Sequence, residues 1–155
     1  MKYLLIIGVT ITIVAILIFS ANSQTSPQIQ STSLPSSQPQ QPVDFIASFK
    51  IITNGTTRVF TNSMYHNLSE DVYINSEDSN TVHVKKSGVT WDDFFKTLPM
   101  KLTKDCLTTG TGQTFCNSET RSLKFYIKEK LEPDALDLII NPGDVLLIDY
   151  GEIAL

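Results

Sequence analysis

The sequence predicts an α+β domain from Asp44 onward, and three observations support this prediction. Apolar and polar residues alternate in several short runs, as they do in strands that have one face against a core and one against solvent. One segment carries apolar residues at helical spacing between a capping residue and a proline. The region also holds two cysteines, Cys106 and Cys116, with a glycine-containing loop between them.

The amino-terminal residues 1–21 are expected to place the rest of the chain outside the cytoplasm. Residues 3–19 carry no charge, and at about 1.5 Å per residue a helix of this length can span a membrane. Because Lys2 is the only basic residue before this run, we expect the carboxyl side to be translocated. We therefore predict one transmembrane helix that anchors a single-pass protein in the cell membrane. The alternative is a signal peptide cleaved near residues 21–23, which would give a secreted product.

The next segment, residues 22–43, is rich in Ser, Gln, Thr and Pro and has no charge. A segment with so few large apolar residues cannot offset the entropy lost on ordering, and its prolines favour extended backbone. We therefore predict a flexible linker over residues 22–43. The remaining residues, 44–155, are within the usual size of one domain, and we predict a single extracytoplasmic domain there.

Several runs in this domain have the pattern of strands. Alternation of apolar and polar residues predicts three strands that each have one solvent-exposed face, at residues 45–51, 82–84 and 123–127. Two further apolar runs, 138–140 and 145–148, flank the turn sequence Asn-Pro-Gly-Asp. Proline fixes its own φ angle in such a turn, and glycine can adopt a positive φ angle. We predict that these two runs pair as closing strands.

One helix is predicted, over residues 91–98. Thr90 precedes it as an N-cap, Asp93 stands where its carboxylate can reach back to that cap, and Pro99 blocks continuation. The apolar residues of this segment recur on one helix face: Trp91, Phe94, Phe95 and Leu98. Such a stripe is ordinarily core, so we assign these aromatic residues to packing rather than to cofactor binding.

Cys106 and Cys116 are the only cysteines of the chain. An even pair in a translocated domain predicts a disulfide. Gly110 and Gly112 lie between them and allow a tight turn that reverses the chain direction. The disulfide is therefore expected to link the two strands of a hairpin. The spacing does not favour a redox-active pair, and a metal site would need two further soft ligands.

The predicted order of elements is strands, a helix, the cysteine hairpin, a further strand and a closing pair, which indicates a β-grasp-like mixed sheet packed on one short helix. Four stretches in this order, residues 81–98, 106–117, 123–127 and 141–151, together resemble a family of small membrane-anchored archaeal and bacterial proteins of uncharacterised function. The resemblance covers about residues 73–151. It implies a β-grasp-like extracytoplasmic domain with the cysteine hairpin inserted after the helix, and an archaeal source.

The same family tends to carry a His-x-His-Asp segment and a further histidine before the helix, which looks like a metal or polar-ligand site. In this sequence only the last histidine, His83, matches clearly, and Asn75 and Glu77 stand where the earlier two would fall. A divalent metal would prefer nitrogen and oxygen ligands of the kind still present in this region. The candidate ligands are His66, Glu77, Asp78 and His83. The alternative is a hydrogen-bonded strand histidine with solvated loop acids.

The chain has a net charge of −4 at pH 7 and no stripe of basic residues. These two features exclude a surface that binds the phosphate backbone of a nucleic acid. No nucleophile elbow or phosphate-binding loop is present, so we predict no catalytic residues and no enzymatic activity. The leading hypothesis is a membrane-tethered interaction module that binds another envelope protein or a small ligand. The alternative is an accessory protein that binds a metal or small ligand through residues 66–83.

Asn54 and Asn67 lie in sequons and are candidate glycosylation sites. The alternative is that the two sequons arise by chance, because Asn, Ser and Thr are abundant in this chain.

Overall fold

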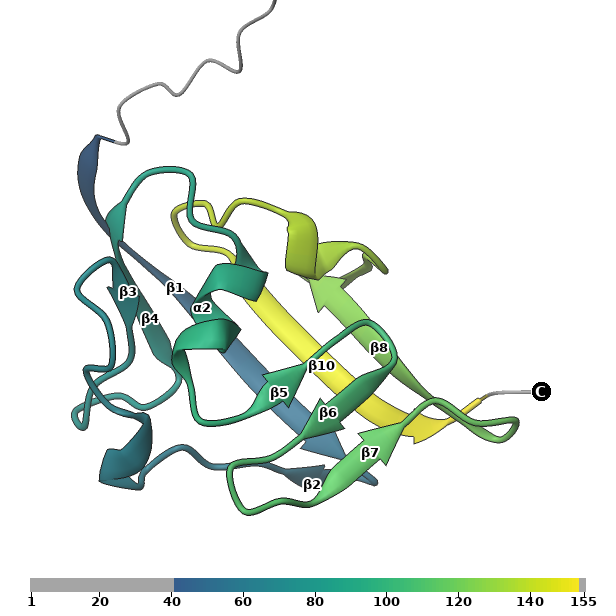
Figure 1. Ribbon diagram of the computed structural model, residues 1–155. Coiled ribbons are helices and arrows are strands. Elements are labelled where there is room, and N and C mark those ends of the chain that lie inside the picture. Colours follow the sequence, from purple (N-terminus) through teal and green to yellow (C-terminus); the bar gives the residue numbers. More distant parts are fainter. Residues whose placement is uncertain (1–40, 154–155) are drawn as a thin grey trace, which may run out of the picture. The chain divides into compact units, whose positions relative to one another are not determined.

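A computed structural model describes residues 41–153 of the chain, which form a mixed α+β arrangement (Figure 1). The predicted membrane anchor, residues 1–21, and nearly all of the predicted linker lie outside the described residues. Within residues 41–153, none of the helices has the length and apolar character needed to cross a membrane. A larger sheet forms one layer, and a helix and a smaller sheet lie against it (Figure 1).

Four long strands make up the middle of the larger sheet, in the order β4-β1-β10-β8. They are β1 (Pro42–Thr53), β4 (Thr81–Lys86), β8 (Arg121–Ile127) and β10 (Val145–Glu152). The first and last of them in the chain, β1 and β10, are parallel neighbours, whereas β4 and β8 are antiparallel to the strands beside them. The three alternating runs are therefore confirmed as strands, within β1, β4 and β8.

Short strands complete this sheet. The edges are β3 (Val72–Tyr73) and β9 (Lys130–Leu131), and β2 (Thr56–Thr57) pairs with the end of β1. At the start of β1, Pro42 occupies the first strand position, where its missing N–H is tolerated. Val43 is half-buried and packs against the core. The strand therefore takes in the last two residues of the predicted linker.

The predicted pairing of residues 138–140 with residues 145–148 is wrong. The second run lies in β10, but β1 occupies one edge of this strand and β8 occupies the other. No edge of β10 is left for residues 138–140, and Ile139 makes only an isolated bridge to Thr90. Ile140 is nevertheless buried, so this apolar run contributes to the core from a loop.

The smaller sheet carries the disulfide. It contains β5 (Lys101–Leu102), β6 (Cys106–Thr108) and β7 (Thr114–Cys116), in that order. Cys106 and Cys116 stand directly opposite each other in the β6–β7 ladder, with a Cα–Cα distance of 4.1 Å, and their sulfur atoms are bonded. The predicted disulfide-stapled hairpin is therefore confirmed. Two single 3₁₀ turns, η1 (Ser63–Tyr65) and η2 (Ala135–Asp137), lie in the connecting segments.

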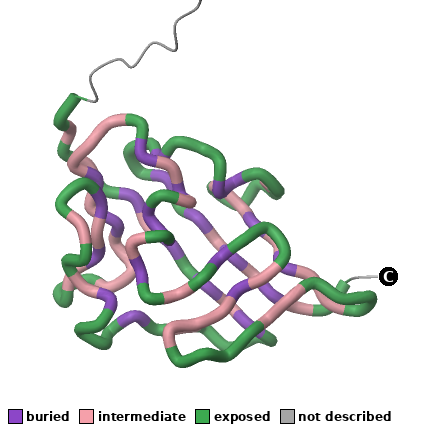
Figure 2. The backbone as a smooth tube through the Cα atoms, viewed as in Figure 1, coloured by how far each residue is buried: buried purple, intermediate pink, exposed green. Residues whose placement is uncertain are grey.

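The core lies between the larger sheet and the helix α2 (Trp91–Thr97), where buried positions alternate along the long strands (Figure 2). Phe49 of β1 stands at its centre and meets the rings of Phe94 and Phe95 edge-on, with centroids 5.3 and 5.6 Å away. Trp91 belongs to the same helix face and is completely buried. The aromatic stripe is thus core, as the sequence predicts.

The start of α2 is fixed by both halves of a capping box. The Asp93 N–H donates to the Thr90 hydroxyl, and the Thr90 N–H donates to the Asp93 carboxylate, at 3.1 and 3.0 Å. The helix ends at Thr97, one residue before the predicted end, with Leu98 as its C-cap. The backbone N–H of Thr90 lowers the pKa of Asp93, because it donates to the charged carboxylate.

We expect the Asp93→Asn variant to lose a few tenths to about 1 kcal/mol of unfolding free energy at pH 7, a range typical of charges at helix ends. Because the pKa of Asp93 is lower in the folded state, its contribution is present above the unfolded value of about 3.9 and is lost as the pH falls through the folded value. Urea titrations from pH 7 to pH 2 should therefore show wild type and variant converging at the acidic end. Asp92→Asn removes a charge from the same turn, together with its ion pair to Lys96, but leaves both bonds of the capping box intact. Its loss of stability at pH 7 should therefore be smaller than that of Asp93→Asn.

Candidate binding site

The four predicted metal ligands do not form one site. His66 follows η1, and its Nε2 lies 2.8 Å from the carbonyl oxygen of Phe60. Glu77, Asp78 and His83 belong instead to β4 and to the loop that precedes it. In the part of the chain that the structure describes, no three His, Cys, Asp or Glu side chains gather closely enough to hold a metal ion.

His83 is a hydrogen-bonded strand residue. Its ring stacks on Tyr73 with centroids 5.1 Å apart, and Nδ2 of Asn75 lies 3.1 Å from its Nε2. Because an amide nitrogen can only donate, this contact occupies the lone pair that a metal would need. The neighbouring Asp78 carboxylate accepts from the hydroxyl of Thr81 at 2.6 Å, and this bond lowers the pKa of Asp78. This geometry matches the second interpretation of the segment, a structural histidine beside solvated acids.

Both sequon asparagines lie on the surface. Asn54 and Gly55 form the tight turn between β1 and β2, with φ angles of 52° and 75°. Asn67 also has a left-handed backbone, with φ of 53°, and it is exposed. The side-chain oxygen of Asn54 accepts a hydrogen bond from Arg121. The two side chains are thus at accessible turns, and glycosylation stays a prediction.

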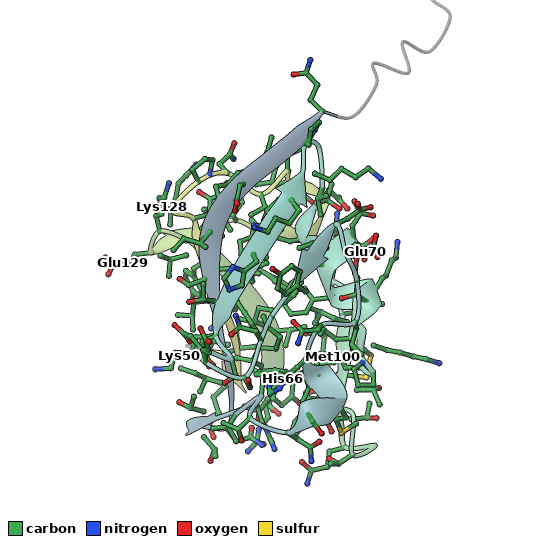
Figure 3. The ribbon with its side chains drawn as sticks, turned by 90° about the vertical axis from the view of Figure 1, so that its left-hand side faces the viewer. Lys50, His66, Glu70, Met100, Lys128 and Glu129 are labelled. Atoms are coloured by element: carbon green, nitrogen blue, oxygen red, sulfur yellow. A yellow bond between two sulfur atoms is a disulfide. The ribbon has the colours of Figure 1, made fainter. Side chains whose placement is uncertain are left out.

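A cavity that the sequence does not predict lies beside the β2–η1 segment and the β6–β7 hairpin, with a volume of about 210 Å³. Its walls combine apolar side chains with hydroxyl groups and one charged residue, Arg58. Met100, which lines it, and the nearby His66 both lie in the lower part of the view in Figure 3. Sites for drug-sized ligands measure roughly 300–1,000 Å³, so this cavity suits a smaller molecule.

Arg58 is held in a fixed orientation at this cavity. Its Nε donates to the hydroxyl of the buried Thr53 at 2.5 Å, and its Nη1 donates to the side-chain oxygen of Gln113 at 2.9 Å. The guanidinium carbon also lies 4.9 Å from the centroid of the Phe115 ring. Among residues 41–153, no carboxylate forms an ion pair with Arg58. A positive charge is thus positioned by neutral neighbours.

Tyr65 and Gly110 meet at another part of the cavity wall. Tyr65 is 8% exposed and packs edge-on against Phe60, with ring centroids 5.1 Å apart. Its hydroxyl makes no side-chain hydrogen bond within the described residues. A Cβ atom on Gly110 would lie 2.6 Å from this hydroxyl oxygen and 2.9 Å from the carbonyl oxygen of Pro99. Glycine is therefore the residue that lets the hairpin approach Tyr65 so closely.

We expect Gly110→Ala to lower the unfolding free energy by about 1–3 kcal/mol, the usual cost of forcing an extra carbon into a packed site. The added Cβ would meet the Pro99 carbonyl, a backbone atom that cannot rotate away. Gly151→Ala is the matched control, since its Cβ would meet nothing nearer than 4.0 Å, and it should change stability far less. Equal stabilities of the two variants in urea denaturation would contradict the close approach at Gly110.

Comparison of the chain with protein-family models, with curated proteins and with solved structures gave no match. The resemblance of residues 73–151 to small membrane-anchored proteins stays a prediction.

Proposed function

We propose that this chain is a membrane-tethered, extracytoplasmic binding module without catalytic activity, and that a small ligand enters the cavity beside Arg58. The observation that carries the proposal is the lining of the cavity, which combines apolar and hydroxyl side chains with one guanidinium. Apolar walls with a few fixed polar groups are typical of ligand sites. A guanidinium carries a positive charge and only hydrogen-bond donors, so it can orient an anion.

The proposed fold is β-grasp-like, within the family of membrane-anchored proteins that the sequence resembles. Support comes from the strand order β4-β1-β10-β8, with the first and last long strands as a central parallel pair. The helix α2 follows the second long strand and precedes the third. A sheet of this kind holds its helix on one face, and the cysteine hairpin extends that same layer (Figure 1).

The proposed location is the outer side of a cell membrane, with residues 1–21 as the anchor and secretion after cleavage as the alternative. The disulfide between Cys106 and Cys116 supports this location, because disulfides persist in oxidising compartments and are rare in a reducing cytosol. The uncharged segment at residues 3–19 provides independent support from the sequence.

Equilibrium dialysis can separate binding from catalysis. The full chain in lipid nanodiscs would be dialysed against a small-molecule extract of the source cells, and both compartments would be profiled by mass spectrometry. We expect at least one compound to be enriched unchanged with the protein. Thr111→Trp, at the exposed cavity wall, should abolish this enrichment, whereas Thr114→Trp on β7 should preserve it. Conversion of a compound into a product, or enrichment that Thr111→Trp leaves intact, would contradict the proposal.

A further inference from the structure

The cavity also indicates what kind of molecule it binds. We infer that it takes a small monocarboxylate with an apolar body, and this inference rests on the proposed binding function. Three features of the described residues support it: the unpaired charge of Arg58, the apolar walls of the cavity, and the hydroxyl of Tyr65.

The first feature is the unpaired charge of Arg58. A guanidinium carries five N–H donors, and two of them are used by neutral acceptors on Thr53 and Gln113. Donors therefore remain for a ligand, and no carboxylate within residues 41–153 neutralises the charge. A planar guanidinium matches the two oxygens of a carboxylate, and such charge-assisted pairs are among the stronger hydrogen bonds. Because Arg58 is the one charged residue in the lining, a monoanion matches it better than a polyanion.

The second feature is the apolar surface of the cavity. Phe60 and Leu107 are almost fully buried and contribute to its walls together with the half-buried Met100. The volume of about 210 Å³ is below the roughly 300–1,000 Å³ of sites for drug-sized ligands. It suits a single ring or a short branched chain. An apolar body of this size would remove the wall from water, which favours binding.

The third feature is the hydroxyl of Tyr65. This side chain lines the cavity and is more than nine-tenths buried, yet its hydroxyl makes no side-chain hydrogen bond within the described residues. The hydroxyl oxygen itself is not fully buried, so it can donate to a ligand oxygen that enters the cavity. That hydrogen bond would add to the affinity. The carboxylate thus has a neutral donor available as well as the charged one.

The methionines of the chain make this inference testable by NMR. The chain has three methionines: Met100 lines the cavity, and the methyl carbon of Met64 lies 3.1 Å from the position of a Gly110 Cβ. Met1 is far from both in the sequence and serves as the reference. The full chain in lipid nanodiscs, labelled with ¹³C at the methionine methyls, would be titrated with benzoate, benzamide and acetate. Benzamide keeps the ring and removes the charge, whereas acetate keeps the charge and removes the ring.

We expect benzoate to shift the Met100 signal saturably, with the Met1 signal unchanged, and to bind at least tenfold more tightly than benzamide or acetate. Arg58→Gln should weaken benzoate binding about tenfold or more. Tyr65→Phe, which keeps the ring, should weaken it several-fold. Arg121→Gln, the same change at the chain's other arginine, which bonds to Asn54 instead, should leave it unchanged.

Equal affinities for benzoate and benzamide would overturn the inference about charge and would leave the proposed binding function standing. Equal affinities for benzoate and acetate would overturn the inference about the apolar body. If no probe moved the Met100 signal, or if Met1 moved in parallel with it, both the inference and the cavity as a binding site would be contradicted. Thermal melting of each variant shows whether it is folded. If Arg58→Gln unfolds, the comparison of probes on wild type and Tyr65→Phe still decides the outcome.

Discussion

Replacing Trp91 by alanine is expected to lower the unfolding free energy by about 3–5 kcal/mol, the range for removing a large aromatic side chain from a core. Trp91 is completely buried, and its ring packs against Phe94 and Phe95 on the same face of α2. The surrounding side chains belong to a close-packed core and can fill the space only partly. Because Trp91 is the only tryptophan, urea unfolding should be followed by circular dichroism rather than by intrinsic tryptophan fluorescence.

The Trp91→Phe variant is the matched control for this prediction. The indole Nε1 is buried without a hydrogen-bond partner in the described part of the chain, so its removal breaks no hydrogen bond. A buried donor of this kind costs about 1–3 kcal/mol when it is left unsatisfied, and removing it offsets part of the volume lost. We expect Trp91→Phe to lose less than half as much stability as Trp91→Ala. Equal losses would contradict this prediction, because they would show that the ring kept by Trp91→Phe recovers none of the lost packing.

Removing the disulfide with Cys106→Ser and Cys116→Ser together is expected to lower the unfolding free energy by about 3 kcal/mol in the chain-entropy description of a short loop. The bridge joins directly opposed residues of β6 and β7, and this hairpin packs on the larger sheet through Phe115 and Tyr150, whose ring centroids lie 5.4 Å apart. The loss should appear as a lower urea midpoint.

A reductant provides the control for the disulfide prediction. Added to the wild type, it should reproduce the loss of stability, and added to the double variant it should change nothing. A double variant as stable as the oxidised wild type would contradict a stabilising role for the bridge.

The features that the sequence predicts correctly are those coded by residues close together in the chain. Alternation places Phe49 and its neighbours on the inner face of β1, and Thr90, Asp93 and Pro99 define the helix within one residue. The cysteine pair and the glycines between them specify the β6–β7 hairpin. Each of these signals depends on local backbone and side-chain preferences.

The features that sequence reasoning misses depend on contacts between distant segments. Residues 138–140 have strand-like composition, but β1 and β8 pair with β10 instead, and no local pattern encodes that competition. The cavity likewise joins Arg58 and Tyr65 of the β2–η1 segment to Gly110 of the distant β6–β7 hairpin. The only available signals were an arginine in a domain with few arginines and a glycine in a hairpin loop. The histidines drew attention because of their chemistry, yet the fold gives His83 a structural hydrogen bond.

Cysteine labelling in intact source cells tests the central claim, an extracytoplasmic domain closed by a disulfide, most directly. Cys106 and Cys116 are the only thiol positions in the chain, so a membrane-impermeant maleimide reports on them alone. We expect no labelling of untreated cells and labelling of both cysteines after a membrane-impermeant reductant, with the membrane still sealed. Labelling without reductant, or labelling that appears only after the cells are lysed, would contradict the account.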